Sequence, residues 1–389
     1  MRRVLIAGLI VGMLFPGVVR AAPEAPARTT VLVMVARGTP TAEVVALHDR
    51  AGAVVTGEIP EVGVYRVSIA PGAAALYERA PSVVAVEAPR VVHIMARRPN
   101  DPLVRLQWGL RTVAAFDAWK VMKKLDEVQV AVMDTGVDAT HIDMENRVLG
   151  GYDYLEIDDD AYDDNGHGTH VAGIIAANIA NRKGVAGLSP NATIIPMKVC
   201  AAAGSCDPFA IYVAAIDSVQ RGADIINMSL GGEGECGDIG QAVFDWIRDQ
   251  GTLTVVSAGN SGADGNPTIT PANCDGTLAV GASDQQNRKA EFSSFGDFVD
   301  IAAPGVGIWS TYPPLVSITS PYIGYAPGDG TSMAAPFVAA AAAVVKGMHP
   351  GWSPDQIERR LLSTATDAGR PGRDDHFGKG ILNLLAAVR

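Results

Sequence analysis

The 389-residue chain has the composition of a folded, turn-rich protein. Hydrophobic residues make up 48% and charged residues 19%, which is enough apolar material for a sizeable core and argues against a largely disordered chain. Acidic residues outnumber basic ones by 42 to 31, for a net charge of -11, and this argues against a nucleic-acid binder, which needs a basic face. At roughly 150 residues per domain, the length suggests two or three domains.

The first 22 residues have the features of a secretory signal peptide. A basic start at positions 2 and 3 precedes the almost wholly apolar run Val4–Val19, and cleavage is expected after Ala21 or Ala22. An uncleaved membrane anchor is the alternative, but the run is shorter than the ~20 residues that span a bilayer, and Pro16 interrupts it. We therefore expect a secreted or periplasmic protein, in an oxidising environment where cysteines can pair.

Residues 29–95 predict a small α+β domain of ferredoxin-like kind. Apolar runs indicate three strands, and helical spacing indicates a helix in each gap. In chain order the expected elements are strand Thr29–Arg37, helix Thr41–Ala51, strand Val62–Ala70, helix Gly72–Arg79 and extended Val83–Ile94. A domain of about 70 residues has a marginal core by itself. Its place between a signal peptide and a larger domain suggests a propeptide, and an accessory domain that stays attached is the alternative.

Residues 96–389 predict a second domain, of the α/β class. The charged, proline-containing stretch 96–102 has the composition of a linker. After it, apolar runs alternate with helical patterns such as Phe209–Arg221 and Ile239–Gln250, which is typical of a parallel sheet flanked by helices on both faces. Ligands bind at the carboxyl ends of such strands. The expected strands are Val128–Asp134, Ala192–Val199, Ala223–Leu230, Thr252–Gly259, Thr277–Ser283 and Asp297–Ala303.

Three short motifs at strand ends and helix starts carry groups suited to nucleophilic catalysis. Asp134 ends the strand VQVAVMD, His167 and His170 lie in GHGTHVAG, and Ser332 lies in GTSMAAP. Each motif alone has an ordinary structural explanation, because aspartate favours turns and serine caps helices. Together, in the order Asp, His, Ser, they resemble the motifs of the subtilases, the subtilisin-like serine proteases.

The resemblance covers nearly all of residues 107–380 and implies a subtilisin-like fold with serine endopeptidase activity. It implies that Ser332 attacks the scissile carbonyl to form an acyl-enzyme, that His167 takes the serine proton, and that Asp134 orients the imidazole. Asp138 and Asp143 are nearby alternatives to Asp134, but only Asp134 directly follows the apolar strand as in the family. The N-terminal domain resembles the family's inhibitory propeptide, which implies a self-processing zymogen.

The same resemblance assigns the oxyanion and substrate sites. The Asn260 side chain, at the end of VVSAGN, is expected to bind the oxyanion together with the Ser332 backbone N–H. An extended peptide that pairs its main chain with the cleft predicts broad specificity. The preferred side chain is not predicted, because the pocket loop Ala263–Asn273 has no reliable register against relatives. The expected substrate-binding residues are Ser229, Leu230, Gly231 and Gly259.

Four cysteines allow three disulfide pairings. We expect Cys200 to pair with Cys206 and Cys236 to pair with Cys274. None of the four neighbours a catalytic-type histidine, which argues against a cysteine protease. Their spacing also lacks the paired C-x-x-C of a zinc site.

No cofactor is expected for catalysis, but subtilases commonly bind structural calcium. The resemblance places Asp143 and Asn181 at a family calcium site, and both side chains offer suitable oxygens. Arg182 and Lys183 bring two positive charges beside the proposed ion and argue against it. The acidic run Glu156–Asp164 could also bind calcium, but an exposed charged loop is the preferred interpretation.

The expected partners are protein or peptide substrates and the chain's own propeptide, which would act as an inhibitor. A monomer that binds no nucleic acid is expected. Two other functions stay open: a catalytically silent binding protein on the same fold, and a peptide ligase or maturation enzyme with a narrow partner. The presence of Asp134, His167, Ser332 and Asn260 argues against a silent protein, and His170 is expected to be a packed structural residue.

Overall fold

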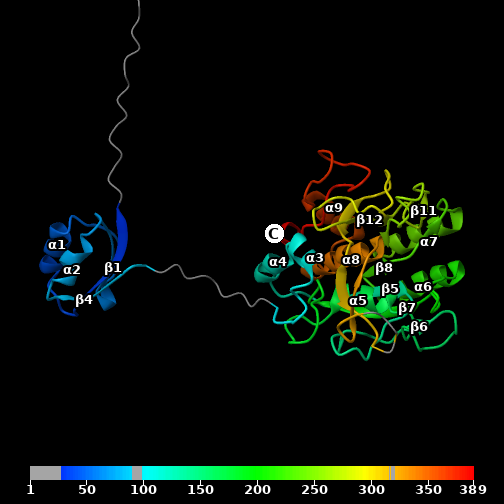
Figure 1. The fold of residues 1–389 in the computed structure, drawn as a ribbon, viewed down its shortest axis with the longest axis horizontal. Coiled ribbons are helices and arrows are strands. Elements are labelled where there is room, and N and C mark those ends of the chain that lie inside the picture. The colour runs from blue at the N-terminus through cyan, green and yellow to red at the C-terminus, as the bar shows by residue number, and fades with distance from the viewer. Residues whose placement is uncertain (1–27, 90–98, 315, 317–319) are drawn as a thin grey trace, which may run out of the picture. The chain divides into compact units, whose positions relative to one another are not determined.

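The computed structural model describes residues 28–89, 99–314, 316 and 320–389. The chain divides into two compact units, Met1–Met95 and Ala96–Arg389 (Figure 1). The expected signal peptide lies outside the described residues, and so does the end of the expected extended segment Val83–Ile94.

The N-terminal unit is a four-stranded antiparallel sheet with helices packed on one face. Its strand order is β2-β3-β1-β4, and its chain order strand-helix-strand-strand-helix-strand is ferredoxin-like. Val33, Val67 and Ile69 from the sheet pack with Leu47 and Tyr77 from the helices. The elements are β1 (Thr29–Val35), α1 (Thr41–Arg50), β2 (Val54–Ile59), the 3-10 turn η1 (Pro60–Val62), β3 (Val64–Ile69), α2 (Ala74–Glu78) and β4 (Val83–Glu87).

Strand β2 is absent from the sequence analysis, and the structure corrects this. Five of its six residues are exposed, and its register with β3 shifts between Val55 and Gly57. The strand therefore lacks the apolar alternation by which a half-buried strand is predicted.

The other face of this small sheet carries exposed apolar side chains. Val54 pairs with Ser68 and Ile59 pairs with Val64, and both partners alternate with the buried Val67 of the same strand. Paired residues share a face of a sheet, so Val54 and Ile59 point away from the helices. They are 55% and 54% exposed.

The larger unit is built on a seven-stranded sheet of order β13-β12-β10-β8-β5-β7-β6, in which neighbouring strands are parallel. The six expected strands are confirmed, as is the α/β class, and β6 is a short addition at one edge. The strands are β5 (Val128–Asp134), β6 (Tyr152–Asp153), β7 (Ala192–Lys198), β8 (Ile225–Met228), β10 (Leu253–Ser257), β12 (Thr277–Ser283) and β13 (Ile301–Pro304).

The strand order has a switch point beside β5. From β5 the chain proceeds to β6 and β7 on one side, and it then crosses to β8 on the other side. In an open parallel sheet, side chains just beyond the carboxyl ends of the strands at such a point line a crevice.

Helices cover both faces of this sheet (Figure 1). Helices α5 (His167–Ala176) and α8 (Thr331–Met348) pack on one face, and α6 (Pro208–Gln220) and α7 (Asp238–Asp249) pack on the other. The remaining elements are α3 (Trp108–Thr112), α4 (Ala115–Val121), α9 (Pro354–Thr364), α10 (Leu384–Ala387) and the two-stranded pairs β9 (Gly232–Glu233) with β11 (Ile269–Thr270) and β14 (Ile308–Thr311) with β15 (Tyr325–Gly328).

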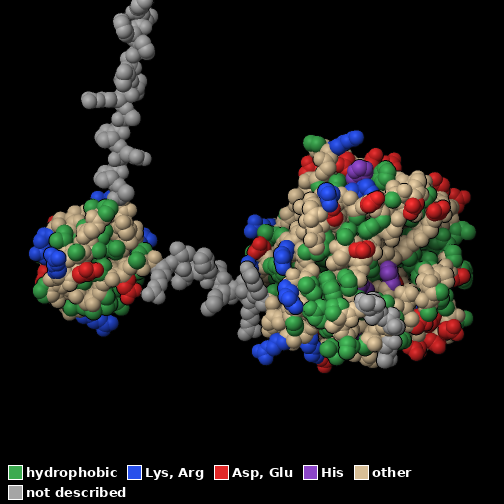
Figure 2. Space-filling model, viewed as in Figure 1, with side chains coloured by type: hydrophobic (Ala, Val, Ile, Leu, Met, Phe, Trp, Pro, Cys, Tyr) green, Lys and Arg blue, Asp and Glu red, His purple; other side chains and the backbone are tan. Residues whose placement is uncertain are grey.

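Helix α8 runs through the core. Within the described ranges it is the one helix long and apolar enough to cross a bilayer, yet 89% of it is buried inside the protein. Its Ala- and Val-rich sequence lets it pack closely against the sheet and α5. On the face shown in Figure 2, acidic, basic and apolar side chains are interspersed over the larger unit.

Candidate active site

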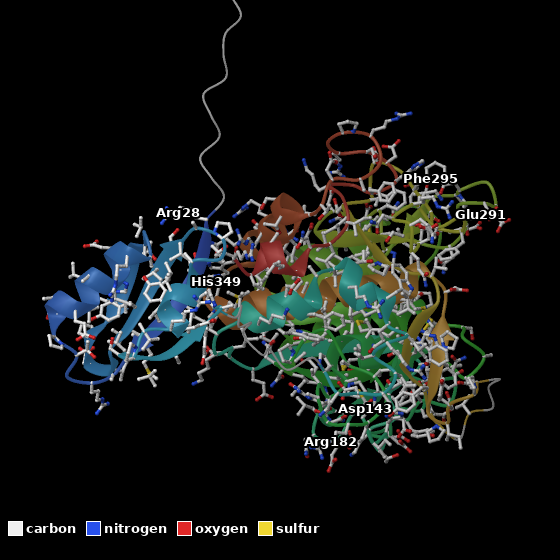
Figure 3. The ribbon with its side chains drawn as sticks, turned by 60° about the vertical axis from the view of Figure 1, so that its left-hand side comes forward. Arg28, Asp143, Arg182, Glu291, Phe295 and His349 are labelled. Atoms are coloured by element: carbon white, nitrogen blue, oxygen red, sulfur yellow. A yellow bond between two sulfur atoms is a disulfide. The ribbon has the colours of Figure 1, made fainter. Side chains whose placement is uncertain are left out.

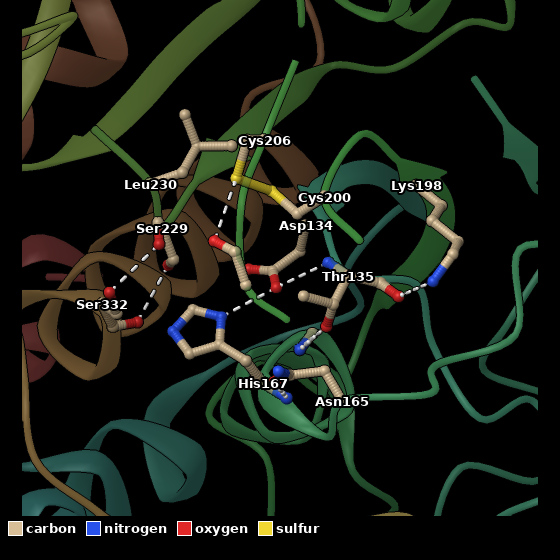
Figure 4. Close-up of a disulfide and its surroundings, with 12 residues drawn as sticks. Asp134, Thr135, Asn165, His167, Lys198, Cys200, Cys206, Ser229, Leu230 and Ser332 are labelled. Atoms are coloured by element: carbon tan, nitrogen blue, oxygen red, sulfur yellow. Dashed lines mark hydrogen bonds and ion pairs between the residues drawn. A yellow bond between two sulfur atoms is a disulfide. The ribbon is translucent and has the colours of Figure 1, made fainter. Parts of the chain in front are cut away.

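Asp134, His167 and Ser332 come from three elements that meet at the carboxyl end of the large sheet. Asp134 is the last residue of β5, His167 is the first of α5, and Ser332 is the second of α8. Oδ1 of Asp134 lies 2.7 Å from Nδ1 of His167. Figure 4 shows the imidazole between Asp134 and Ser332. The three predicted residues are thus brought to one place.

The charges around His167 stabilise the protonated form of its imidazole relative to the same group in water. Asp134 is 1% exposed, whereas the His167 side chain is 32% exposed. Burial by itself disfavours the imidazolium, but the charge and hydrogen bond of Asp134, with the charge of Asp163, outweigh it. The pKa of His167 is therefore raised above its ordinary value of 6.5.

Asp163 fixes the start of the helix that carries His167. Its carboxylate accepts hydrogen bonds from the backbone N–H groups of Asn165, Gly166 and Thr169 at 3.1, 2.8 and 2.8 Å, which helix α5 cannot satisfy by itself. It also accepts one from the hydroxyl of Thr135 at 2.8 Å. One buried carboxylate therefore links the strand end after Asp134 to the helix of His167.

Lys198 forms a second link between the same two segments. Its buried ammonium donates to the backbone oxygen of Thr135 at 2.7 Å and to Oδ1 of Asp164 at 2.7 Å. Thr135 follows Asp134, and Asp164 precedes His167 by three residues. Since a buried ammonium is stable only when it is paired, Lys198 holds these two segments at a fixed separation.

The loop closed by Cys200 and Cys206 supports the same side of the site (Figure 4). The backbone N–H of Cys200 donates to the carbonyl of Asp134 at 3.1 Å. The Asn165 side chain donates to the carbonyl of Ala202 in this loop at 2.8 Å and accepts from the N–H of His167 at 3.1 Å. The loop is therefore hydrogen-bonded directly to Asp134 and is connected to His167 through the side chain of Asn165.

Ser332 lies at the amino end of α8, where the backbone N–H groups of the first turn lack intrahelical partners. Its hydroxyl donates to the carbonyl of Ser229 at 3.0 Å, and the hydroxyl of Ser229 donates back to the carbonyl of Ser332 at 2.8 Å. The serine proton is thus held by a backbone oxygen, and the hydroxyl must reorient before His167 can take it. Hydrogen bonds between catalytic groups commonly tighten only when substrate is bound.

Asn260 is oriented by the residue next to Ser332. Its side-chain oxygen accepts from the N–H of Thr331 at 2.9 Å and from the Thr331 hydroxyl at 3.0 Å. That hydroxyl in turn accepts from the N–H of Gly259 at 3.1 Å. Because the amide oxygen is engaged, the amide nitrogen faces the other way, as a hydrogen-bond donor for an oxyanion must.

The expected substrate-binding residues follow two neighbouring strands. Ser229, Leu230 and Gly231 come directly after β8, and Gly259 follows β10, which pairs with β8. Leu230 also lines a cavity of about 460 Å³ together with Cys206 and residues of α6 and α7. The two segments therefore lie at neighbouring strand ends, and Ser229 joins the first of them to Ser332 through its two hydrogen bonds.

Both disulfides have the pairing that we expected, Cys200 with Cys206 and Cys236 with Cys274. His170 is buried, and its Nε2 lies 3.1 Å from the carbonyl oxygen of Ala326. Burial, with the neighbouring His167, lowers the pKa of His170 to about 4. It is therefore neutral at ordinary pH and has the environment of a packed core residue.

The residues proposed to hold calcium do not fit the ion. Asn181 donates its side-chain N–H to Oδ1 of Asp143 at 2.6 Å, and Oδ2 of Asp143 accepts from the N–H of Val185 at 2.9 Å. The Asn181 oxygen accepts from the N–H of Lys183 at 2.8 Å. Calcium needs six to eight oxygen ligands, whereas here the oxygens are already bonded to donors. Figure 3 shows Asp143 and Arg182 in this same region of the unit.

The structure corrects the prediction that the acidic run Glu156–Asp164 is an exposed charged loop. An exposed charged loop describes Asp158, Asp159 and Asp160, but Asp163 is wholly buried and caps α5. The sequence also gave no reason to select Lys198. Its one signal was a charge at the end of an otherwise apolar strand, because such a buried charge requires a partner.

The fold, the Asp-His pair and a serine at a helix start define a serine hydrolase of the α/β class, and the comparisons agree. The sequence pattern of the subtilase family matches residues 126–380. The chain belongs to the subtilase family and is a subtilisin-like serine endopeptidase.

Individual relatives are similar over most of their length. Subtilisin DY of Bacillus licheniformis is 40% identical over 67% of this chain and 91% of its own. Alkaline elastase YaB of Bacillus sp. (strain YaB) is 39% identical over 77% of this chain and 75% of its own. Among solved structures, a protease from Pseudoalteromonas arctica has a TM-score of 0.68 at 33% identity, over 75% of this chain and 99% of its own. Fervidolysin from Fervidobacterium pennivorans has a TM-score of 0.68 at 29% identity, over 95% of this chain and 62% of its own.

Proposed function

We propose that this protein is an exported, self-processing endopeptidase that uses Asp134, His167 and Ser332 as its catalytic triad. The observation that carries the proposal is the 2.7 Å contact between Asp134 and His167 at the start of α5, opposite Ser332 in the first turn of α8. Asp138 is also buried, but its carboxylate accepts from the Thr140 N–H and hydroxyl and not from His167.

In the first step Ser332 attacks the scissile carbonyl carbon. Its hydroxyl leaves the Ser229 oxygen, and the proton passes to Nε2 of His167 as the new C–O bond forms. Asp134, bonded to Nδ1, holds the ring in the tautomer that leaves Nε2 free to accept and stabilises the imidazolium that results.

The tetrahedral intermediate carries its negative charge on the former carbonyl oxygen. The amide nitrogen of Asn260 and the backbone N–H of Ser332 are the donors for this oxyanion, and they are fixed before the reaction starts. Collapse of the intermediate breaks the C–N bond, and His167 protonates the departing amine. Water then attacks the acyl-enzyme by the same route and releases Ser332.

The N-terminal unit would act as an inhibitory propeptide, released by cleavage near Met95. Its small core and the exposed apolar side chains of Val54 and Ile59 support this role. An exposed apolar sheet face is stabilised when another protein surface covers it, as binding of an inhibitor to its enzyme would do. Residues 1–22 would direct export and be removed. Main-chain recognition in the cleft supports broad specificity towards protein substrates.

The test compares intact masses of exported wild type and Ser332→Ala. We expect the wild type to lose the segment up to the region of Met95 and the variant to keep it. Retention of the segment in both proteins would contradict self-processing. Loss in both would show cleavage by another protease and would contradict self-processing as well.

Two further measurements separate the alternative functions. A fluorophosphonate probe should label wild type at Ser332 and leave Ser332→Ala unlabelled, whereas a silent binding protein would not label. Casein should be degraded to many peptides, whereas a ligase or maturation enzyme with a narrow partner would leave casein intact.

A further inference from the structure

Asn227 is a polar side chain at the centre of the large sheet. It lies on β8, where it pairs with Val132 of β5 on one side and with Val255 of β10 on the other. It is wholly buried, and so are both valines and the adjacent Ile226 and Met228. Burial of an amide among apolar side chains costs free energy unless the amide is hydrogen-bonded, so the partner of Asn227 shows what the residue does.

The partner is the hydroxyl of Ser229, which lies 3.0 Å from the amide nitrogen of Asn227. A hydroxyl has a single proton to donate, and Ser229 donates it to the carbonyl of Ser332 at 2.8 Å. The proton between Asn227 and Ser229 must therefore come from the amide N–H. The amide oxygen has no hydrogen-bond partner among the described residues, so the bond to Ser229 orients this side chain.

The carbonyl of Ser332 needs a donor from outside its own helix. In an α-helix a carbonyl accepts from the N–H four residues further on. For Ser332 that residue is Pro336, which has no N–H. The Ser229 hydroxyl is a donor in its place, and the Ser332 hydroxyl donates in turn to the carbonyl of Ser229 at 3.0 Å (Figure 4).

A chain of hydrogen bonds thus connects the middle of the sheet to the nucleophile. Strands on both sides fix the backbone of Asn227, its amide holds the hydroxyl of Ser229, and that hydroxyl holds the first turn of α8. Without the amide, the Ser229 hydroxyl loses the donor that orients it and can rotate away from the Ser332 carbonyl. The start of α8 then loses its tie to β8, and a small displacement of a reacting group slows a reaction strongly.

We propose that Asn227 is a positioning residue for Ser332, which acts through the hydroxyl of Ser229 and touches neither the substrate nor the reacting atoms. This inference rests on the proposed function. It explains why the central strand β8 carries an amide at a position where an apolar side chain would pack.

The test replaces Asn227 by leucine, which has a similar shape and no donor. Asn227→Leu should lower kcat about 10-fold and keep KM within about twofold of wild type, because a displaced nucleophile affects the reaction more than binding. Labelling of Ser332 by a small fluorophosphonate should slow by a similar factor, and the final extent of labelling counts the folded sites. The acidic limb of the kcat/KM profile should stay in place, because no charge is removed.

A double-mutant cycle with Ser229→Ala tests the route of the effect. Once the Ser229 hydroxyl is gone, Asn227→Leu should lower neither kcat nor the labelling rate any further. Losses that multiply in the double variant would overturn the inference. Wild-type rates in Asn227→Leu, or a change confined to KM, would overturn it as well.

Ser218→Ala is the control, because it removes a buried hydroxyl on α6 that donates to the carbonyl of Ala214 at 2.7 Å. It should keep both rates, and losses equal to those of Asn227→Leu would indicate a general effect of buried polar groups and contradict a positioning role. Asn227→Ala gives the same comparison if the leucine variant does not fold. Absence of labelling in wild type would instead contradict the proposed function.

Discussion

Asp134 and His167 are positioned by charged and polar side chains, whereas Ser332 and Asn260 are positioned by backbone groups and a buried helix. We call these the acid–base side and the nucleophile side of the site. On the acid–base side, Asp163 and Lys198 each bridge the strand end after Asp134 to the start of α5.

The nucleophile side contains no comparable charge among the described residues that contact it. Thr331 connects Asn260 to Ser332 through neutral hydrogen bonds, and Ser229 exchanges two hydrogen bonds with Ser332. Buried ions hold position only while their partners and protonation states persist. The difference therefore predicts that pH affects the acid–base side, and that substitutions on the nucleophile side lower turnover without changing the pH profile.

The largest effect is expected from Asp134→Asn. Replacing the carboxylate by an amide removes the charge and disturbs the imidazole tautomer, so kcat/KM should fall by about 10⁴-fold. His167 must be neutral to accept the serine proton, and the activity of wild type therefore rises as pH rises through the pKa of His167, above 6.5. Without the Asp134 charge this pKa falls, so the acidic limb of the kcat/KM profile should move to lower pH.

Asp138→Asn is the matched control for that variant, since Asp138 is buried close by but does not contact His167. Its acidic limb should stay at the wild-type position. If the acidic limb moved in Asp138→Asn but not in Asp134→Asn, the charge that raises the pKa of His167 would belong to Asp138 and our assignment to Asp134 would be wrong.

Asn260→Ala should lower kcat by about 10²–10³-fold, a magnitude known from subtilisin itself and not obtained from this chain. The variant loses an oxyanion donor and no charge, so the pH profile should keep its shape. Steady-state kinetics across pH 5 to 10 would measure both. Asn383→Ala, which removes the cap of α10, should affect stability but not kcat. A shifted acidic limb in Asn260→Ala would contradict the division into two sides.

Lys198→Met should lower kcat by roughly 10-fold with little change in KM, since a small misplacement of catalytic groups slows the reaction more than it weakens binding. It leaves the carbonyl of Thr135 and the carboxylate of Asp164 without their ammonium partner. Lys346→Met, at the far end of α8 from Ser332, is the control and should keep kcat. Equal losses of kcat in the two variants would indicate a general effect on stability and not a positioning role.

The smallest effect on activity is expected from Cys200→Ser with Cys206→Ser. Opening a loop with a sequence separation of 6 should lower the free energy of unfolding by about 2 kcal/mol in the chain-entropy description. Denaturant unfolding in the Ser332→Ala background would measure this without self-digestion. Activity should fall only a few-fold, because backbone hydrogen bonds still connect the loop to Asp134. A loss of activity as large as that of Lys198→Met would show that the disulfide contributes more to the position of Asp134 than we expect.

The sequence predicts the large sheet well, because parallel strands buried on both faces are nearly continuous apolar runs. Asp134 ends one of those runs, whereas His167 and Ser332 lie in the first turns of α5 and α8, so their meeting at one edge is predicted by the motif resemblance and not by the runs alone. Strand β2 could not be predicted in the same way, since its residues are mostly exposed.

Other parts of the site depend on contacts that a local pattern does not contain. Composition cannot show that Asp163, among several acidic neighbours, is the one that turns inward. Likewise Ile269 meets Gly231 only because β11 pairs with β9, and the two residues lie far apart in the chain. This contact is therefore a property of the tertiary structure.

The burial of α8 bears on how such an enzyme survives its own activity. A protease is also a potential substrate, and cleavage requires an extended segment that can enter the cleft. Helix α8 is embedded in the core, so its backbone becomes extended only when the larger unit opens as a whole. Self-digestion should therefore begin in surface loops, and a nicked molecule can keep Ser332 in place until global unfolding exposes the helix.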